Sequence, residues 1–488
     1  MRADLVIRGG RVVDPASGFD EIADVAVTDG RITAVGASID IAATSTIEAN
    51  DLVVTPGFID LHSHSHDIAG HRLQALDGCT TLLELEGGLL PIDVAYQRVA
   101  GEGRPLNYGF STSWALARMQ ILAGHGADGR IGSFLANIND PAWQRVASGT
   151  EVAQMLDLLQ RDLAAGALGI GVLVGYAPLI DPSEYVAVAR LAAQAAVPTY
   201  THSREIVESN PQTPIDGAEE IVRAAGETGA HMHYCHLNST SRRHTDRVLG
   251  VVERAQAAGS RVTTEAYPYG AGSTGIGATF LDPDRLERWG LAPHNIRYMP
   301  TGEHVADADR LRELRAKDPG GLAIIEFLDE NDPVDMGYLH RALAFPGAVV
   351  ASDAMPLTWT DTTPQPDVWP LPAAASTHPR TAGTFARSLR LLLDALELPL
   401  IDALAKMSYW PARLLEESVP AMARKGRLAV GADADVLVFD ASQMRDRATY
   451  DDSTRTSVGV QHLLVHGEPV VRDGELLLDA RPGQPIAR

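Results

Sequence analysis

The sequence predicts an α/β fold: a (β/α)8 TIM-like barrel with a small β-sandwich built from both chain ends. Short apolar strands alternate with Ala- and Leu-rich helical stretches through the middle of the chain, which is the pattern of a parallel sheet. Metal-binding residue types stand at the ends of several of these strands. The two ends of the chain lack this alternation and instead repeat a pattern of strand, tight turn and strand.

The two chain ends have similar sequence patterns. Residues 1–55 contain DLVIRGGRVVD and DVAVTDGRITAVG, and the second stretch includes the hairpin signal Asp29-Gly30. Residues 416–488 contain HLLVHGEPVVRDG, which is similar to the first of these stretches. We therefore expect residues 1–55 and 416–488 to pair into one discontinuous β-sandwich.

The middle of the chain, residues 56–415, is expected to form the barrel. Helical stretches such as EVAQMLDLLQRDLAAG separate eight strand segments. These segments are 53–64, 80–86, 107–114, 167–174, 198–205, 231–239, 261–269 and 348–354. The gap between the last two is too long for an ordinary loop, so we expect an inserted subdomain at about 282–345. In such barrels the active site lies at the C-terminal ends of the strands.

Composition and charge limit the classes of function. The chain has 488 residues and a formal net charge of −22, and its pI of about 5.1 disfavours nucleic acid or an anionic membrane as a partner. Its two cysteines, Cys79 and Cys235, lie far apart and favour a reducing compartment over a disulfide framework. No signal-peptide pattern and no membrane-spanning apolar run is present. We therefore expect a cytoplasmic protein that acts on a small molecule, and homo-oligomer formation stays open.

The stretch TPGFIDLHSHSHD carries the strongest chemical signal. Residues i and i+2 of a strand point to the same face, so His62 and His64 can reach one point at its end. Four later strands end in a similar way. Their candidate ligands are Glu84 and Glu86 in TTLLELEGG, His202 in PTYTHSRE, His236 in HMHYCHLNS and Asp353 in VVASDA. Each residue alone could be an ordinary polar strand end, but together they indicate one metal site on one rim of the barrel.

Histidines combined with carboxylates suit Zn2+ or another divalent metal, and the set is large enough for one or two ions. Metal coordination lowers the pKa of a bound water to about 7. Asp353 could take the proton of that water and pass it to a leaving amine, as general acid/base. This chemistry is metal-dependent hydrolysis of an amide C–N bond. Of the two glutamates, Glu86 lies nearer the rim and is the favoured ligand, with Glu84 behind it, or the reverse.

These motifs, together with several others, resemble those of the amidohydrolase superfamily and, within it, of the N-acyl-D-amino-acid deacylase (D-aminoacylase) group. The similarity spans nearly the whole chain. Its landmarks are PGFIDLHSH at 56–64, THSRE at 201–205, CHLNS at 235–239, EAYPYGAGST at 265–274, SD at 352–353, HPRTAGTFAR at 378–387 and KGRLAVGADADVLVFD at 425–440.

The resemblance implies roles for particular residues. The implied metal ligands are His62, His64, His202, His236 and Asp353, and Asp353 is also the implied general acid/base. Tyr267, Ser273 and Arg380 stand where the group binds the carboxylate of the acyl-amino acid, and a guanidinium suits that role because it can bind a carboxylate through two hydrogen bonds. Asn238 and Arg204 complete the predicted substrate-binding set.

Two positions depart from the pattern of the group. Strand two often supplies a Cys, and other amidohydrolases use a carboxylated Lys, but LLELEGG contains neither. None of the three lysines, Lys317, Lys406 and Lys425, lies in the first six strands, so a glutamate bridge is the remaining option. The group often has Lys at the position of Asn238, so one positive charge near the substrate carboxylate is missing here.

The leading hypothesis is therefore zinc-dependent deacylation of N-acyl-D-amino acids. The acyl group, the side chain, D or L selectivity and the number of metal ions stay open at this point. One alternative is a cyclic-amide hydrolase of the dihydroorotase or hydantoinase kind. A second alternative is a catalytically inactive scaffold of the same fold, but the full set of ligand residues favours an enzyme.

Overall fold

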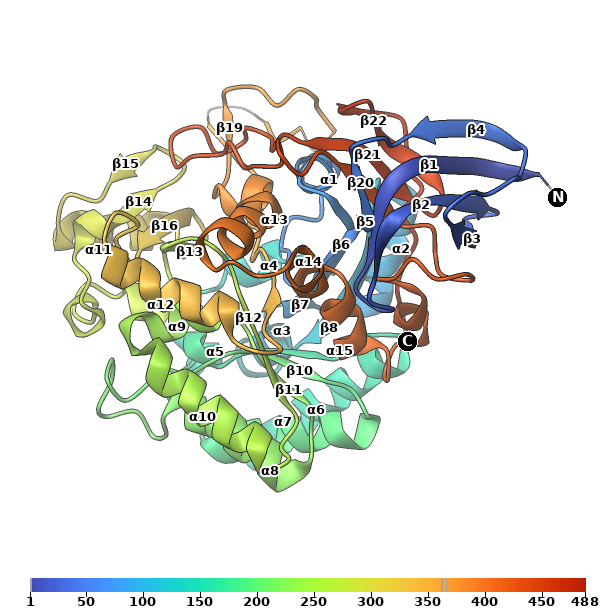
Figure 1. The fold of residues 1–488 in the computed structure, drawn as a ribbon. Helices are drawn as coiled ribbons and strands as arrows, with labels where there is room; N and C mark the ends of the chain where they lie inside the picture. The colour runs from blue at the N-terminus through green and yellow to red at the C-terminus, as the bar shows by residue number, and fades with distance from the viewer. Residues whose placement is uncertain (1, 361–362, 366) are drawn as a thin grey trace.

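Eight parallel strands form a barrel at the centre of the molecule (Figure 1). The computed structural model describes residues 2–360, 363–365 and 367–488. The barrel strands, in sheet order, are β17 (Val349–Val350), β12 (Val262–Ala266), β11 (Met232–Tyr234), β10 (Thr199–His202), β9 (Ile170–Leu173), β8 (Asn107–Ser113), β7 (Cys79–Leu89) and β6 (Phe58–Asp60). Each overlaps one predicted segment, so the predicted (β/α)8 barrel is confirmed.

The first and last barrel strands meet at Asp60. Its buried carboxylate accepts hydrogen bonds from the Ser352 backbone N–H at 3.0 Å and from Gln74 Nε2 at 2.8 Å. Nearby, the His64 N–H donates to the Ala354 carbonyl at 2.8 Å. Burial raises the pKa of Asp60 to about 6, although its hydrogen-bond donors act in the opposite direction. These contacts tie β6 to the segment after β17, so they fix the two ends of the barrel relative to each other.

Helices cover the outside of the barrel, and local capping sets where they begin. In α6 (Gly149–Ala164), the side chains of Ser148 and Glu151 accept from each other's backbone N–H groups, which forms a capping box. The other covering helices include α2 (Ile92–Glu102), α7 (Pro182–Ala195), α8 (Gly217–Thr228), α10 (Thr245–Ala257) and α12 (Pro333–Ala344). Among the described residues, no helix is both long and apolar enough to cross a membrane.

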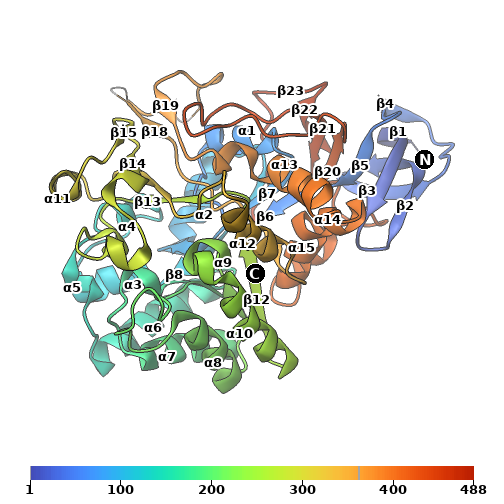
Figure 2. The same ribbon diagram turned by 60° about the vertical axis from the view of Figure 1, so that its left-hand side comes forward.

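Both chain ends contribute to one nine-stranded sheet beside the barrel (Figure 2). In order, its strands are β23 (Glu475–Leu476), β22 (Glu468–Arg472), β21 (Val460–Val465), β20 (Val436–Phe439), β5 (Val53–Pro56), β1 (Ala3–Asp14), β2 (Phe19–Thr28) and β3 (Arg31–Gly36), with β4 (Ala43–Glu48) paired to β1. Because β5 lies between β1 and β20, it joins the two ends of the chain. The predicted pairing of the chain ends is confirmed, whereas the exact domain limits stay predictions.

The prediction of a single strand over 53–64 is wrong. The chain changes sheet at Gly57, where β5 of the terminal sheet gives way to β6 of the barrel. A side chain at Gly57 would overlap the side chain of Thr80 on β7, so only glycine lets the backbone pass this closely. Both β5 and β6 are fully buried, so the apolar pattern runs through the junction and does not reveal it.

A four-stranded antiparallel sheet is inserted between β12 and β17. Its strands, in order, are β13 (Ala271–Gly275), β16 (Leu322–Glu326), β14 (Ile296–Tyr298) and β15 (Glu303–His304), and α11 (Ala308–Lys317) lies beside them. In Figures 1 and 2 this sheet and the terminal sheet lie on opposite sides of the barrel. The sheet begins with β13, before the predicted start of the insertion at 282, and β13 carries the predicted substrate-binding residue Ser273.

Lys425 provides a test of how the terminal sheet is joined to the barrel. Its buried ammonium lies 2.6 Å from Asp435 Oδ2 and 3.0 Å from Asp433 Oδ2, and Asp435 also accepts from Asn107 on β8. We expect Lys425→Met to lower the free energy of unfolding by about 3–5 kcal/mol, because it leaves the Asp435 carboxylate buried without its cation, whereas Asp433 keeps Arg31 and Arg424. Urea and thermal unfolding measure the loss.

Lys317→Met is the matched control, because Lys317 is exposed at the end of α11. This substitution should change the free energy of unfolding by no more than about 0.5 kcal/mol. Equal stability of the two variants would show that the Lys425 ion pairs do not hold the two parts together.

Candidate active site

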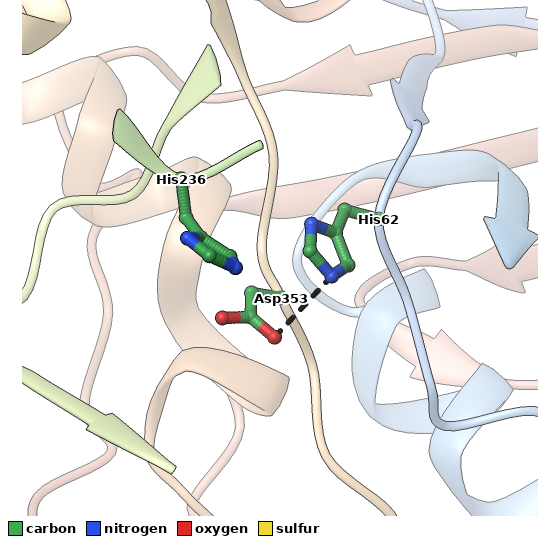
Figure 3. A group of neighbouring side chains, drawn as sticks. All are labelled: His62, His236 and Asp353. Carbon is green, nitrogen blue, oxygen red and sulfur yellow. Dashed lines mark ion pairs between the residues drawn. The ribbon is translucent and has the colours of Figure 1, made fainter. Parts of the chain in front are cut away.

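The predicted metal ligands all converge at the C-terminal end of the barrel. They come from five strands: His62 and His64 follow β6, Glu84 and Glu86 lie on β7, His202 ends β10, His236 follows β11, and Asp353 follows β17. Figure 3 shows the side chains of His62, His236 and Asp353 pointing toward one another from three separate segments. Potential ligand atoms of these three residues lie within 4.8 Å of one another.

Glu86 lies between two pairs of histidines. Its Oε2 is 3.3 Å from His62 Nε2 and 3.8 Å from His64 Nε2. Its Oε1 is 2.6 Å from His236 Nε2 and 3.2 Å from His202 Nδ1. Burial would raise the pKa of Glu86, but the facing histidines hold it well below its usual value. One carboxylate therefore serves two adjacent sets of donors, which is the arrangement that a bridging ligand requires.

Glu84 lies behind His64. Its Oε2 is 2.8 Å from His64 Nδ1, whereas the other ring nitrogen, Nε2, is 3.1 Å from His62 Nε2 and faces the cluster. Burial would lower the pKa of His64, but Glu84 raises it to about 9. Glu84 thus fixes the orientation of the His64 ring, and only Glu86 of the two glutamates faces both histidine pairs.

Asp353 also contacts the first histidine pair, His62 and His64. Its Oδ1 is 3.4 Å from His62 Nε2 and 3.5 Å from His64 Nε2. Arg380, the first residue of α13 (Arg380–Arg390), places Nη2 2.9 Å from the same oxygen. Burial would raise the pKa of Asp353, but Arg380 together with the neighbouring histidines, His62, His64 and His236, lowers it. The carboxylate is therefore held in its ionised form.

The backbone turns sharply at two of these residues. His236 has a φ of +30° and Asp353 a φ of +51°, both in a region that L-residues adopt at a cost of about 1–3 kcal/mol. Each residue stands just after a short barrel strand, β11 or β17, and the turn directs its side chain toward the cluster. Strain of this kind persists where the surrounding structure fixes the backbone, and it is concentrated at functional sites.

A pocket opens onto the cluster, and Arg380 lies on its wall. The guanidinium is 4.8 Å from the centre of the Tyr267 ring, and Nη2 donates to the Ser273 carbonyl at 3.2 Å. Its Nε and Nη1 are buried and have no hydrogen-bond partner among the described residues. Unpaired N–H groups on a buried cation are costly, so this side chain is suited to receive an anion.

Comparison with known proteins agrees with this geometry. The profile of the amidohydrolase family matches residues 45–471. The chain belongs to the amidohydrolase family. Its relatives include N-acyl-D-glutamate deacylase of Alcaligenes xylosoxydans xylosoxydans, which is 29% identical over 96% of this chain and 93% of the relative. D-aminoacylase of the same organism is 28% identical over 99% of this chain and 98% of the relative.

Solved structures give the same relationship. N-acyl-D-glutamate deacylase of Bordetella bronchiseptica, in complex with zinc and a phosphonate that mimics the tetrahedral intermediate, matches with a TM-score of 0.78 and 26% identity over 100% of both chains. L-hydantoinase of Arthrobacter aurescens matches with a TM-score of 0.58 and 18% identity over 100% of both chains, which shows a shared fold alone. The predicted resemblance to the D-aminoacylase group is confirmed.

The metal-ligand cluster of this amidohydrolase also contacts a buried carboxylate, Glu265 on β12, that sequence reasoning missed. Its Oε1 is 2.5 Å from His62 Nδ1, and its Oε2 is 2.9 Å from His233 Nε2. It also accepts a hydrogen bond from the His236 backbone N–H at 3.2 Å. A glutamate within a buried strand was the available signal, because such a charge is costly without a partner.

The charges of this amidohydrolase site fit a cation. Four buried carboxylates, Glu84, Glu86, Glu265 and Asp353, meet one guanidinium, Arg380, at the cluster. A histidine must be neutral to bind a metal ion, and with neutral histidines three negative charges lack compensation. Imidazole and carboxylate donors at these separations are the ligands that Zn2+ prefers, and the Nδ1 partners Glu84 and Glu265 fix the ring orientations that ligation needs.

Two predicted substrate-binding residues lie outside the pocket of this amidohydrolase. Arg204 is buried in a two-point ion pair with Glu220 of α8, at 2.9 and 2.8 Å, so its charge is already neutralised and it holds the loop after β10. Arg204 therefore does not belong to the substrate site. Asn238 is also buried, and its side chain donates to the Tyr267 carbonyl at 3.2 Å. It supports the backbone of Tyr267 and does not line the described pocket.

Glu265 provides a test of indirect control over the metal site. We expect Glu265→Gln to weaken Zn2+ binding about 10- to 100-fold, because the variant removes the negative charge that orients His62 and raises its basicity. Competition with a chromogenic chelator measures this affinity. The control is Glu326→Gln at the exposed end of β16, which should bind zinc like the parent protein. Equal affinities of all three proteins would contradict a positioning role for Glu265.

Proposed function

We propose that this amidohydrolase hydrolyses the amide C–N bond of N-acyl-D-amino acids. The observation that carries the proposal is the Arg380 side chain, which contacts Asp353 beside the donor cluster. The N–H groups of its buried Nε and Nη1 have no hydrogen-bond partner among the described residues. A substrate with a carboxylate near its amide would satisfy these N–H groups and bring the amide to Asp353. The relatives named N-acyl-D-glutamate deacylase and D-aminoacylase support this class of substrate.

We infer that the site holds zinc, bound by six residues: His62, His64, Glu86, His202, His236 and Asp353. A divalent ion in this position supplies Lewis acidity, which polarises a carbonyl and makes water acidic near neutral pH. Three uncompensated negative charges favour two ions over one, because a single divalent ion would leave the buried site anionic. With two ions, one positive charge remains for an anionic reactant. Glu86, which contacts both histidine pairs, would serve as a ligand beside each of them.

Asp353 is the proposed general acid/base. Its ionised carboxylate accepts the proton of the attacking water and then donates it to the nitrogen of the leaving amine. The charge of Arg380 favours the ionised form at the start of this cycle. The nearby histidine rings are held by Glu84 and Glu265, so the carboxylate acts within a fixed array of neighbours.

Arg380, Tyr267 and Ser273 form the proposed anchor for the substrate carboxylate. The free Nε and Nη1 of Arg380 supply two charged donors, which compensate for the neutral Asn238 where the group often has Lys. Gly272 leaves the necessary room, since a Cβ there would lie 3.1 Å from the Tyr267 hydroxyl and 3.7 Å from Arg380 Nη1.

The alternatives receive less support. The hypothesis of a cyclic-amide hydrolase rests on more distant relatives. One is the dihydroorotase of Syntrophotalea carbinolica, at 25% identity over 89% of this chain and 89% of the relative. An inactive scaffold would not need a complete donor set. We also propose the domain limits 1–55, 56–415 and 416–488, and a cytoplasmic location, which the two free and buried cysteines support.

A panel of substrates tests the proposed reaction. We expect zinc-loaded enzyme to release free amino acid from N-acyl-D-amino acids faster than from their L-enantiomers, and to leave hydantoin and dihydroorotate unchanged. Asp353→Asn should lower kcat at least about 100-fold, because the general acid/base is lost. Asp394→Asn, at an exposed position, is the control. Faster turnover of a cyclic amide would reject the proposal, and near-parent turnover of Asp353→Asn would reject its mechanism.

The two glutamates of β7 should differ in their effect on metal content. We expect Glu86→Gln to lower the number of tightly bound zinc ions, because both histidine pairs lose their shared ligand. Glu84→Gln should keep the stoichiometry and weaken affinity about 10- to 100-fold, because it loses only the orientation of His64. Elemental analysis after dialysis against defined free zinc distinguishes them. Loss of an ion in Glu84→Gln alone would reverse the assignment.

A further inference from the structure

Four aromatic side chains form a continuous surface in the pocket. We call Phe134, Tyr176, Phe280 and Trp289 the aromatic wall, because successive ring centres lie 5.3, 5.2 and 5.3 Å apart. They come from separate segments, after β8, after β9 and from the inserted region after β13. All four line the pocket that opens onto the metal-ligand cluster. Three chain segments thus converge to build one apolar surface.

The aromatic wall adjoins His202. The His202 ring lies 4.8 Å from that of Tyr176, and it stacks on Phe280 at 5.8 Å with an interplanar angle of 13°. Arg380 instead contacts Asp353, whose nearest histidines are His62 and His64. The carboxylate anchor and the aromatic wall therefore adjoin different members of the ligand cluster, and the reacting amide has to lie between them.

The covalent order of an N-acyl amino acid matches this arrangement. Its side chain branches at the carbon that carries the carboxylate, so the side chain stays near Arg380. Its acyl substituent lies beyond the nitrogen and the scissile carbonyl, and therefore reaches farthest from the carboxylate. With the carboxylate at Arg380 and the carbonyl at the ligand cluster, the acyl substituent meets the aromatic wall.

Trp289 is held rigidly at the end of the wall. The Arg242 guanidinium lies over its ring at 4.1 Å and donates to its backbone carbonyl at 2.6 Å. The indole N–H donates to Glu205 Oε1 at 3.0 Å, so the ring is fixed by its polar edge as well. Phe280 stacks on Trp289 with an interplanar angle of 22°. Rings that are ordered before binding lose little entropy when an apolar group packs against them.

We propose that the aromatic wall is the acyl-group subsite, and that this enzyme selects acyl groups larger and more apolar than acetyl. Suitable groups are a hexanoyl chain or a phenylacetyl group, which can bury their carbon atoms against the four rings. The inference rests on the proposed function. The apolar side chains Leu135, Leu173, Leu281 and Leu291 complete the surroundings of the wall.

The first test varies the acyl group on one D-amino acid. We expect kcat/KM to rise about threefold to fourfold per added methylene from acetyl through butanoyl to hexanoyl, with phenylacetyl also preferred. Succinyl should give no such gain, because its terminal carboxylate would lose solvation at the wall. Equal kcat/KM values for all acyl groups would contradict the inference, and so would a preference for the succinyl substrate through its contact with Arg242. Either result would still show that the enzyme removes acyl groups from amino acids.

The second test compares kcat/KM for the hexanoyl substrate with kcat/KM for the acetyl substrate, and it takes the ratio of the two values in Trp289→Ala. We expect this ratio to fall at least about tenfold in Trp289→Ala, since an acyl subsite discriminates between the two substrates. The control Trp410→Ala, at an exposed position on α15 (Tyr409–Leu415), should keep the parent ratio. If the wall only supported His202, both substrates would slow equally and the ratio would not change.

The alternative assignment is that the aromatic wall binds the amino-acid side chain and not the acyl group. A parallel series of substrates with one acyl group and different side chains tests it. If kcat/KM rises only with side-chain size, and Trp289→Ala removes that rise, the wall binds the side chain and the inference is wrong. If no N-acyl amino acid is hydrolysed, the proposed function fails first. Calorimetric binding of phenylacetate against acetate to the zinc-loaded protein then decides the subsite: equal affinities overturn it, and a phenylacetate preference that Trp289→Ala abolishes supports it.

Discussion

The contact of Glu86 with two pairs of histidines is the constraint on which the rest of the site depends. A carboxylate buried inside a barrel is stable only if its charge is compensated, and four imidazoles lie within ion-pair distance of this one. Those imidazoles in turn need fixed orientations, which Glu84 and Glu265 provide through the opposite ring nitrogens. Each added carboxylate increases the negative charge, so the same interactions that order the rings also create a strong site for cations.

Closure of the barrel positions Asp353 relative to the histidines of the site. Asp60 connects β6 to the backbone after β17, and this places His62 and Asp353 at a defined distance although they are almost 300 residues apart in sequence. The positive φ values of His236 and Asp353 are sustained within that frame. A barrel with short strands can thus hold strained residues at its rim, because the cost is distributed over many contacts elsewhere.

Local sequence pattern predicted the barrel and its candidate ligands because both depend on short-range features. An apolar run followed by a polar residue is visible in His62, His202 and Asp353 without knowledge of their neighbours. The features that were missed depend on contacts between distant segments. Successive side chains of a strand alternate between its two faces, so the sequence places Glu84 and Glu86 on the same face and cannot distinguish them. Their contacts with different histidines do distinguish them.

Other misses have the same origin. The division of the predicted strand 53–64 depends on the close approach of Gly57 to Thr80, and a run of buried residues gives no sign of it. Arg204 follows a barrel strand as a substrate-binding residue would, but Glu220 on a later helix already neutralises it. Arg380 differs from Arg204 because it lines the pocket and has no carboxylate other than Asp353 within ion-pair distance among the described residues, and its role in substrate binding stays a prediction.

Arg380 links substrate binding to proton transfer in the proposed reaction. Burial alone would raise the pKa of Asp353, and the guanidinium of Arg380 together with the neighbouring histidines keeps it low, so the carboxylate is ready to accept a proton. A substrate carboxylate at the free Nε and Nη1 of Arg380 brings a negative charge to the same guanidinium and opposes its effect. The pKa of Asp353 then rises, which makes its protonated form, the donor to the leaving amine, easier to reach. A neutral amide would leave Asp353 a good proton acceptor but a poor donor, and this gives a physical reason for the enzyme to prefer N-acyl amino acids over amides without a carboxylate.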